Sequence, residues 1–184
     1  MKYPFKHLKV KSNEPFNLEN LTEELKRRKR GEILHLTLSL VKTWEDFEKI
    51  SLLVKKAFFI SGEKPFNWNL EKDFINPLKA LVNLPNLRIL FPSSKEKLES
   101  LFRERDLLFK GLIFRPDRII LYPYKVIVVD FKTHQLEGQS NLLENYQRQV
   151  KNYTEAVFQI FQRPAQGFLL FIEEPKLEEV CFLC

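Results

Sequence analysis

The segment from Arg115 to Lys132, RPDRIILYPYKVIVVDFK, constrains the fold of this chain more than any other. Within it, Val126–Val129 is a run of four aliphatic residues, which is typical of a strand buried on both faces. Asp130 and Lys132 follow two positions apart, so their side chains share one face of the strand while Phe131 points to the other. The segment predicts a core strand that ends in a carboxylate and an ammonium group side by side.

The acidic residues of this segment suggest its chemistry. Asp117 follows Pro116, and Asp130 stands two positions before Lys132. This pattern is typical of sites that hydrolyse phosphodiesters with a divalent ion, which binds a nonbridging oxygen and makes hydroxide available at neutral pH. Carboxylates are ligands that Mg²⁺ prefers. The alternative is an ordinary hairpin whose charges only mark the exposed end of a strand.

The composition is that of a globular protein. At 184 residues the chain is expected to form one domain, and 44% hydrophobic residues can fill its core. A net charge of +6 suits a polyanionic partner without demanding one. Neither a secretory signal nor an apolar stretch of membrane-spanning length is present, so we expect a cytoplasmic protein without a membrane partner. Its two cysteines, Cys181 and Cys184, cannot complete a four-ligand zinc or iron–sulfur site alone.

The first half of the chain, about residues 1–85, is predicted to be mostly helical. Helices are expected from Asn20 to about Arg30, from Trp44 to about Phe59 and from Asn69 to about Val82. The segment Ile33–Val41 is ambiguous. Its alternation of apolar and other residues favours a strand, whereas Gly31 can end one helix and open the next.

The second half, about residues 86–184, carries the predicted strands. These are Leu87–Phe91, Leu101–Phe109 with Glu104, Arg118–Tyr122, Val126–Phe131 and Gly167–Ile172, and a long amphipathic helix occupies Asn141–Phe161. This order predicts one mixed α/β domain over residues 1–184.

The run Lys26–Arg30, KRRKR, has two interpretations. Five successive residues span more than one helical turn, so the five cations cannot all face one partner. One interpretation is a solvated helix end, where cations are favoured by the helix dipole. The other is a patch that contacts phosphates, since the run lies just before a candidate site residue, His35.

Other polar residues recur at related spacings. Glu104 lies 13 residues before Asp117 (117 − 104), and Asp117 lies 13 before Asp130 (130 − 117), each in its own strand-like segment. Neighbouring strands can place these three carboxylates together. Gln149 and Tyr153 are four residues apart and share one face of the long helix.

Taken in order, RGEILH, Glu104, RPDR, VVDFK and QVKNY resemble the RecB-type nuclease domain of the PD-(D/E)xK superfamily, found at the C-terminus of AddA- and RecB-like helicase–nucleases. The match runs from about Arg30 to about Ile172. The resemblance implies a restriction-endonuclease-like fold, with a mixed central sheet flanked by helices and a helical N-terminal part, and it requires a helix at Ile33–Val41. It also implies a DNA nuclease that depends on Mg²⁺ or Mn²⁺.

The resemblance gives each matching residue a role. Metal ligands would be Asp117, Asp130, the Phe131 carbonyl and His35, while Lys132 would orient the attacking water and stabilise charge at the phosphate. Glu104 would hold a water or the metal at the edge of the site. Gln149 and Tyr153 would contact DNA or support the site, and Arg118 would brace Asp117 or touch DNA. The ordinary alternatives are a satisfied helix residue for His35, a pairing of Glu104 with Arg103 or Arg105, and a core position for Tyr153.

Two departures from the family shape the expected function. Some relatives carry four cysteines that bind an iron–sulfur cluster, and this chain lacks them, so we expect no cluster. It also lacks the nucleotide-binding loop G-x-x-x-x-G-K-[ST] of a helicase motor. We therefore predict an exonuclease-type enzyme of DNA recombination or repair that works with a separate helicase or repair subunit. The alternatives are a catalytically idle DNA- or helicase-binding module and a structure-specific repair endonuclease.

Overall fold

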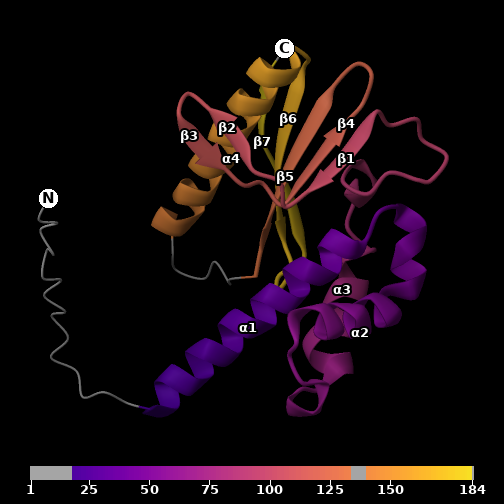
Figure 1. The fold of residues 1–184 in the computed structure, drawn as a ribbon, viewed down its shortest axis with the longest axis vertical. Coiled ribbons are helices and arrows are strands. Elements are labelled where there is room, and N and C mark those ends of the chain that lie inside the picture. Colours follow the sequence, from indigo (N-terminus) through magenta and orange to yellow (C-terminus); the bar gives the residue numbers. More distant parts are fainter. Residues whose placement is uncertain (1–17, 134–139, 184) are drawn as a thin grey trace, which may run out of the picture.

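The N-terminal part of the molecule is helical. The computed structural model describes residues 18–133 and 140–183; the side chains of residues 18–21 and 140 lie outside this description, as does the predicted helix cap at Asn20. The helical elements are α1 (Leu18–Leu40), η1 (Trp44–Lys49), α2 (Ile50–Ser61), η2 (Pro65–Asn67), η3 (Glu71–Ile75), α3 (Asn76–Leu81) and η4 (Leu87–Ile89). Figure 1 shows α1 crossing diagonally below the sheet, with α2 and α3 beside it.

The sheet has five strands in the order β1-β4-β5-β6-β7. Their bounds are Ser100–Arg103 for β1, Arg118–Leu121 for β4, Val126–Lys132 for β5, Ala165–Phe171 for β6 and Lys176–Leu183 for β7. Only the β5–β6 pair is parallel, and α4 (Ser140–Phe161) makes the crossover between these two strands. The predicted mixed α/β class with a mixed sheet flanked by helices is therefore confirmed.

Alternation along β5 divides the interior into two layers. Ile127, Val129 and Phe131 pack with α1, α2 and α3 in the larger core. Val126 and Val128 pack on the opposite face, against Tyr153 and Val157 of α4. Because side chains alternate along a strand, Asp130 and Lys132 lie on the face covered by α4, and Phe131 lies on the face covered by α1, α2 and α3. The sequence predicted that Phe131 would face away from the other two.

Strand register brings the three predicted carboxylates to one end of the sheet. Arg103 of β1 pairs with Arg118 of β4, and Arg118 in turn pairs with Val129 of β5. One position further toward the same end of the sheet, the chain carries Glu104 just after β1, Asp117 just before β4 and Asp130 in β5. The equal spacing of these residues in the sequence thus reflects three neighbouring strands.

Gly31 does not interrupt α1, so the predicted helix end near Arg30 is wrong. The helix continues to Leu40, and the buried residues Ile33, Leu34 and Leu38 follow helical spacing instead of the strand alternation. A Cβ at Gly31 would lie 3.0 Å from Thr133 Oγ1, just after the end of β5. The glycine therefore allows α1 to approach the end of the central strand closely.

Three other predicted elements differ from the structure. The run Leu87–Phe91 contains the short helix η4 and no strand. The predicted strand Leu101–Phe109 is divided into β1 and β2 (Leu107–Phe109), and β2 pairs with β3 (Leu112–Phe114) in a separate two-stranded sheet. The predicted helix from Trp44 begins as the 3₁₀ helix η1. By contrast, the predicted start at Asn69 is confirmed, because its side chain accepts a hydrogen bond from the Lys72 N–H at 3.0 Å.

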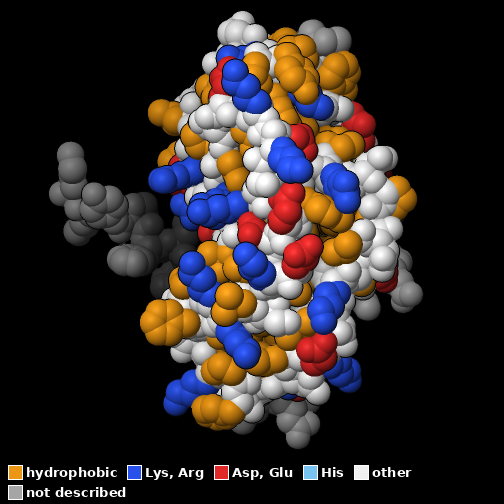
Figure 2. Space-filling model, turned by 90° about the vertical axis from the view of Figure 1, so that its right-hand side faces the viewer, with side chains coloured by type: hydrophobic (Ala, Val, Ile, Leu, Met, Phe, Trp, Pro, Cys, Tyr) orange, Lys and Arg blue, Asp and Glu red, His pale blue; other side chains and the backbone are white. Residues whose placement is uncertain are grey.

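The outer face of α2 is not covered by the described chain. Leu52, Phe59, Ile60 and, just after the helix, Phe66 are between 52% and 88% exposed. Figure 2 shows hydrophobic and Lys or Arg side chains interspersed over the lower part of the face where α2 lies. Apolar groups gathered in this way are typical of contact surfaces. None of the described helices is both long and apolar enough to cross a membrane.

Candidate active site

Asp130 and Lys132 form a buried ion pair at the end of β5. Lys132 Nζ lies 2.5 Å from Asp130 Oδ2, and the two side chains are only 13% and 6% exposed. The Lys132 ammonium group is therefore the partner of this buried oxygen, which accepts no other hydrogen bond from the described residues. Burial raises the pKa of Asp130; Lys132 opposes this shift, and the nearby charge of Asp117 adds to it.

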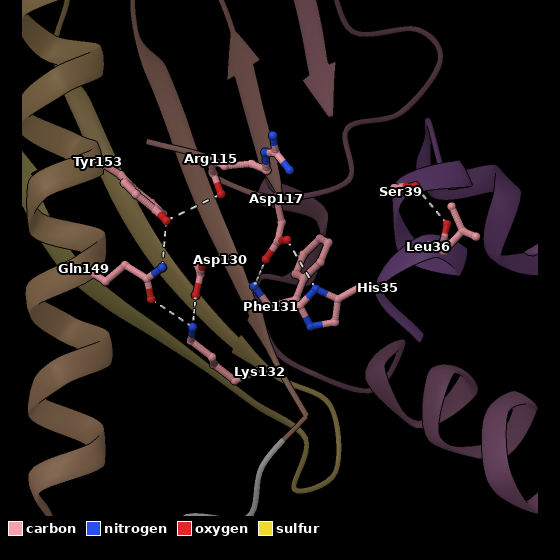
Figure 3. Close-up of polar contacts among 10 residues, drawn as sticks. All are labelled: His35, Leu36, Ser39, Arg115, Asp117, Asp130, Phe131, Lys132, Gln149 and Tyr153. Carbon is pink, nitrogen blue, oxygen red and sulfur yellow. Dashed lines mark hydrogen bonds and ion pairs between the residues drawn. The ribbon is translucent and has the colours of Figure 1, made fainter. Parts of the chain in front are cut away.

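A chain of polar contacts from α4 holds Lys132 in place. Its ammonium group donates to Gln149 Oε1 at 3.0 Å, and Gln149 Nε2 donates to the Tyr153 hydroxyl at 2.7 Å. Tyr153 in turn donates to the Arg115 carbonyl at 3.4 Å. Figure 3 shows this series running from Lys132 along α4 to the segment just before β4. Gln149 and Tyr153 therefore support Lys132, which is one of the two roles expected of them.

Asp117 connects the end of β5 to α1. Its Oδ2 accepts a hydrogen bond from the Phe131 N–H at 2.6 Å, and its Oδ1 lies 3.2 Å from His35 Nδ1. The His35 ring also meets Phe131 edge-on, with ring centroids 5.9 Å apart. In a strand, the N–H and C=O of one residue point to the same side. The Phe131 carbonyl therefore faces the side on which Asp117 lies.

Glu104 lies in the turn after β1, and the prediction that it sits within a strand is wrong. Its φ is 49°, a left-handed conformation that non-glycine residues rarely adopt. Its backbone N–H donates to the Asp117 carbonyl at 3.0 Å, which holds the turn against the start of β4. Backbone strain of this kind often accompanies functional sites.

One half of the site borders an open cavity of about 830 Å³ between α1 and the ends of the strands. Its walls include His35, Glu104 and Asp117, together with Arg115, Thr133 and a stripe of α1 residues from Glu24 to Leu36. We call this half of the site, formed by His35, Glu104 and Asp117, the open side. Asp130, Lys132, Gln149 and Tyr153 do not line the cavity, and we call them the closed side.

The candidate ligands are of types that suit a divalent ion, but in the described part of the chain they are not all close together. Two carboxylates, a backbone carbonyl and an imidazole suit Mg²⁺ or Mn²⁺. The charge on the buried Oδ2 of Asp130 is balanced by the ion pair with Lys132, and this oxygen accepts no further hydrogen bond from the described residues. However, no group of three or more His, Cys, Asp or Glu side chains among the described residues is close enough to hold a metal. The carboxylates are instead engaged by His35 and Lys132, with which a metal ion would compete.

Arg118 is a structural residue, and the prediction that it touches DNA is wrong. Its side chain is fully buried and donates to the backbone carbonyls of Leu38, Val41 and Leu90. The guanidinium also lies 4.3 Å from the centre of the Phe91 ring. Burial lowers the pKa of Arg118 to about 9. The residue binds β4 to the C-terminal end of α1, and it thereby fixes the two elements that carry Asp117 and His35.

Two residues at the site were not expected from the sequence. The Tyr146 ring lies 4.1 Å from Lys132 Nζ, so the ammonium group meets both an amide oxygen and an aromatic face. Tyr146 stands three positions before Gln149, and this helical spacing was the available signal. Thr133, which lines the cavity opposite Gly31, had no comparable signal.

The chain was compared with protein-family models and with curated proteins. No family model matches the chain, and no curated protein matches it significantly. The resemblance described above therefore rests on the residues themselves.

Proposed function

We propose that this protein is a Mg²⁺- or Mn²⁺-dependent deoxyribonuclease with a restriction-endonuclease-like fold. The observation that carries the proposal is the buried Asp130–Lys132 pair, held by Gln149 and Tyr153 beside Asp117. A buried ion pair is weak evidence for stability, because desolvation offsets much of its attraction. Such a pair, fixed by a polar chain of its own, is better explained by chemistry at the strand end.

Each residue of the site has a task in this proposal. Asp117, Asp130, the Phe131 carbonyl and His35 would hold the metal. A bound divalent ion supplies a nucleophilic water at neutral pH and neutralises a nonbridging phosphate oxygen. Lys132 orients that water and stabilises negative charge at the phosphate. Gln149 and Tyr153 keep Lys132 in place, and Glu104 holds a water at the rim of the cavity.

A digestion assay tests the proposal directly. Labelled single strands, duplexes and forks are incubated with Mg²⁺, Mn²⁺ or a chelator. We expect cleavage only with metal, loss of cleavage in Asp130→Asn, and full cleavage in the control Lys110→Met, which removes an exposed lysine paired with Glu155. Equal activity of Asp130→Asn and the wild type would contradict the proposal. The preferred substrate separates exonuclease action in recombination or repair from a structure-specific repair endonuclease.

The second candidate is a catalytically idle module that binds DNA or a helicase. It is favoured by the engagement of both aspartates with protein side chains, Asp117 with His35 and Asp130 with Lys132. An idle module would bind DNA without cleaving it under any metal condition, so the same assay distinguishes the two functions.

We also propose that a separate helicase or repair subunit works with this nuclease. The support is the sequence, which contains no nucleotide-binding loop to drive movement along a strand. The purified chain should then degrade DNA slowly and with low processivity. Rapid, processive and ATP-independent digestion would contradict this part of the proposal.

A further inference from the structure

The basic run Lys26–Arg30 lies within α1 and not at its end, and its cations divide into two groups. Lys29 pairs with Glu63 at 2.7 Å. Arg30 donates to the Asp73 carbonyl at 2.9 Å and pairs with Glu173. These two residues attach α1 to the surrounding structure, so they are not free for a ligand.

Lys26, Arg27 and Arg28 are placed differently. Arg27 and Arg28 line the site cavity on the same stripe of α1 as Gly31 and His35. Arg28 is paired with Glu32 at 3.0 Å, whereas Arg27 forms no ion pair within residues 22–133 and 141–183. Among the described residues, the Arg27 guanidinium therefore remains available to bind a ligand at the cavity wall.

A second hollow of about 210 Å³ adjoins this wall. Lys26, Arg27, Arg30 and Trp68 line it together with Glu23 and Asp73, so Arg27 belongs to both hollows. Lys26 Nζ lies 5.7 Å from the centre of the Trp68 ring. One oxygen of the acidic Asp73 is already engaged, because its Oδ2 accepts the Asn69 N–H at 2.9 Å.

The distance along α1 from His35 to Arg27 is one that a short strand can span. Arg27 precedes His35 by eight residues (35 − 27), which is about 12 Å along a helix axis. At about 3.4 Å per nucleotide in a stacked strand, this is about three to four nucleotides. Basic groups beside an aromatic ring are the combination that proteins use for single-stranded nucleic acid.

We infer that α1 guides a single nucleic acid strand from the site cavity over Arg27 into the second hollow. Arg27 and Lys26 contact phosphates there, and Trp68 forms the wall beside a base. The inference rests on the proposed nuclease function and extends it, because it gives the strand a binding site outside the group of residues that would hold the metal.

Oligonucleotide length tests the inference. Binding is measured by fluorescence anisotropy with Ca²⁺ in place of Mg²⁺, using a labelled trinucleotide and a single strand of about 16 nucleotides. Arg27→Gln and the double variant Lys26→Gln/Arg27→Gln should weaken binding of the longer strand about three- to tenfold, and each lost contact should reduce the salt slope by about 0.7. Trinucleotide binding should not change. The matched control Lys29→Gln removes the same charge from a residue that lines neither hollow and pairs with Glu63, and it should bind like the wild type.

Each outcome is decisive. Wild-type binding of the longer strand by Arg27→Gln, or an equal loss in Lys29→Gln, would overturn the inference while leaving the nuclease proposal intact. A selective loss in Arg27→Gln with no cleavage by the wild type would support the strand site and reject the nuclease. A wild-type protein that binds no oligonucleotide would overturn both.

Discussion

The two sides of the candidate site differ in how much the fold has already fixed. On the closed side, Asp130 and Lys132 are 6% and 13% exposed and are held by Gln149 and Tyr153. On the open side, Asp117 and His35 are 17% and 29% exposed and border a cavity of about 830 Å³. In the proposed nuclease, the closed side would hold the Lys132 ammonium group in position, and the open side would admit the substrate.

Among substitutions that leave the proposed metal ligands in place, removing Lys132 should give the largest effect on catalysis. Lys132→Met keeps the length of the side chain but removes the positioned charge, and such a loss commonly costs about 10²- to 10³-fold in rate. Single-turnover cleavage measures this effect, with Lys110→Met, which removes an exposed lysine paired with Glu155 of α4, as the control. A rate near that of the wild type would show that the closed side does not take part in the chemistry.

Removing Arg118 should give the largest effect on stability. Arg118→Met leaves three backbone carbonyls without their charged donor, which we expect to lower the free energy of unfolding by about 2–4 kcal/mol. Urea denaturation checks this value. The control Arg28→Met breaks an exposed pair within one helix and should cost less than about 0.5 kcal/mol. Equal losses in the two variants would mean that Arg118 does not hold α1 to β4.

Gln149 should have a smaller effect, confined to the closed side. Gln149→Leu removes the amide that connects Lys132 to Tyr153, and loss of such a supporting contact typically costs about 10- to 100-fold in activity. We expect a lower rate at saturating metal with an unchanged metal affinity. A weakened metal affinity with an unchanged rate would place Gln149 in support of the ligands instead of Lys132.

The closed side was the more predictable half because its signals are local in the sequence. The aliphatic run Val126–Val129 identifies β5, and the spacing of Asp130 and Lys132 gives their common face. The four-residue spacing of Gln149 and Tyr153 likewise places both on one face of α4. Periodicity alone determines these features once the element is known.

The open side was less predictable because it depends on contacts between distant segments. Gly31 looks like a helix end, yet it lies within α1, where the absence of a side chain leaves room for Thr133. From the sequence, Arg118 is expected to brace Asp117 or to touch DNA, yet its side chain is buried and donates to carbonyls at the end of α1. The left-handed turn at Glu104 follows from a hydrogen bond to Asp117 that no sequence pattern reveals.

A calorimetric titration with Mn²⁺ tests the central claim, that the two sides form one metal site, most directly. The wild type, Asp117→Asn and Asp130→Asn are compared, since one aspartate lies on each side. The account predicts binding by the wild type and a loss of affinity of about tenfold or more in each variant, because each removes a charged ligand. An unchanged affinity in both variants would contradict it.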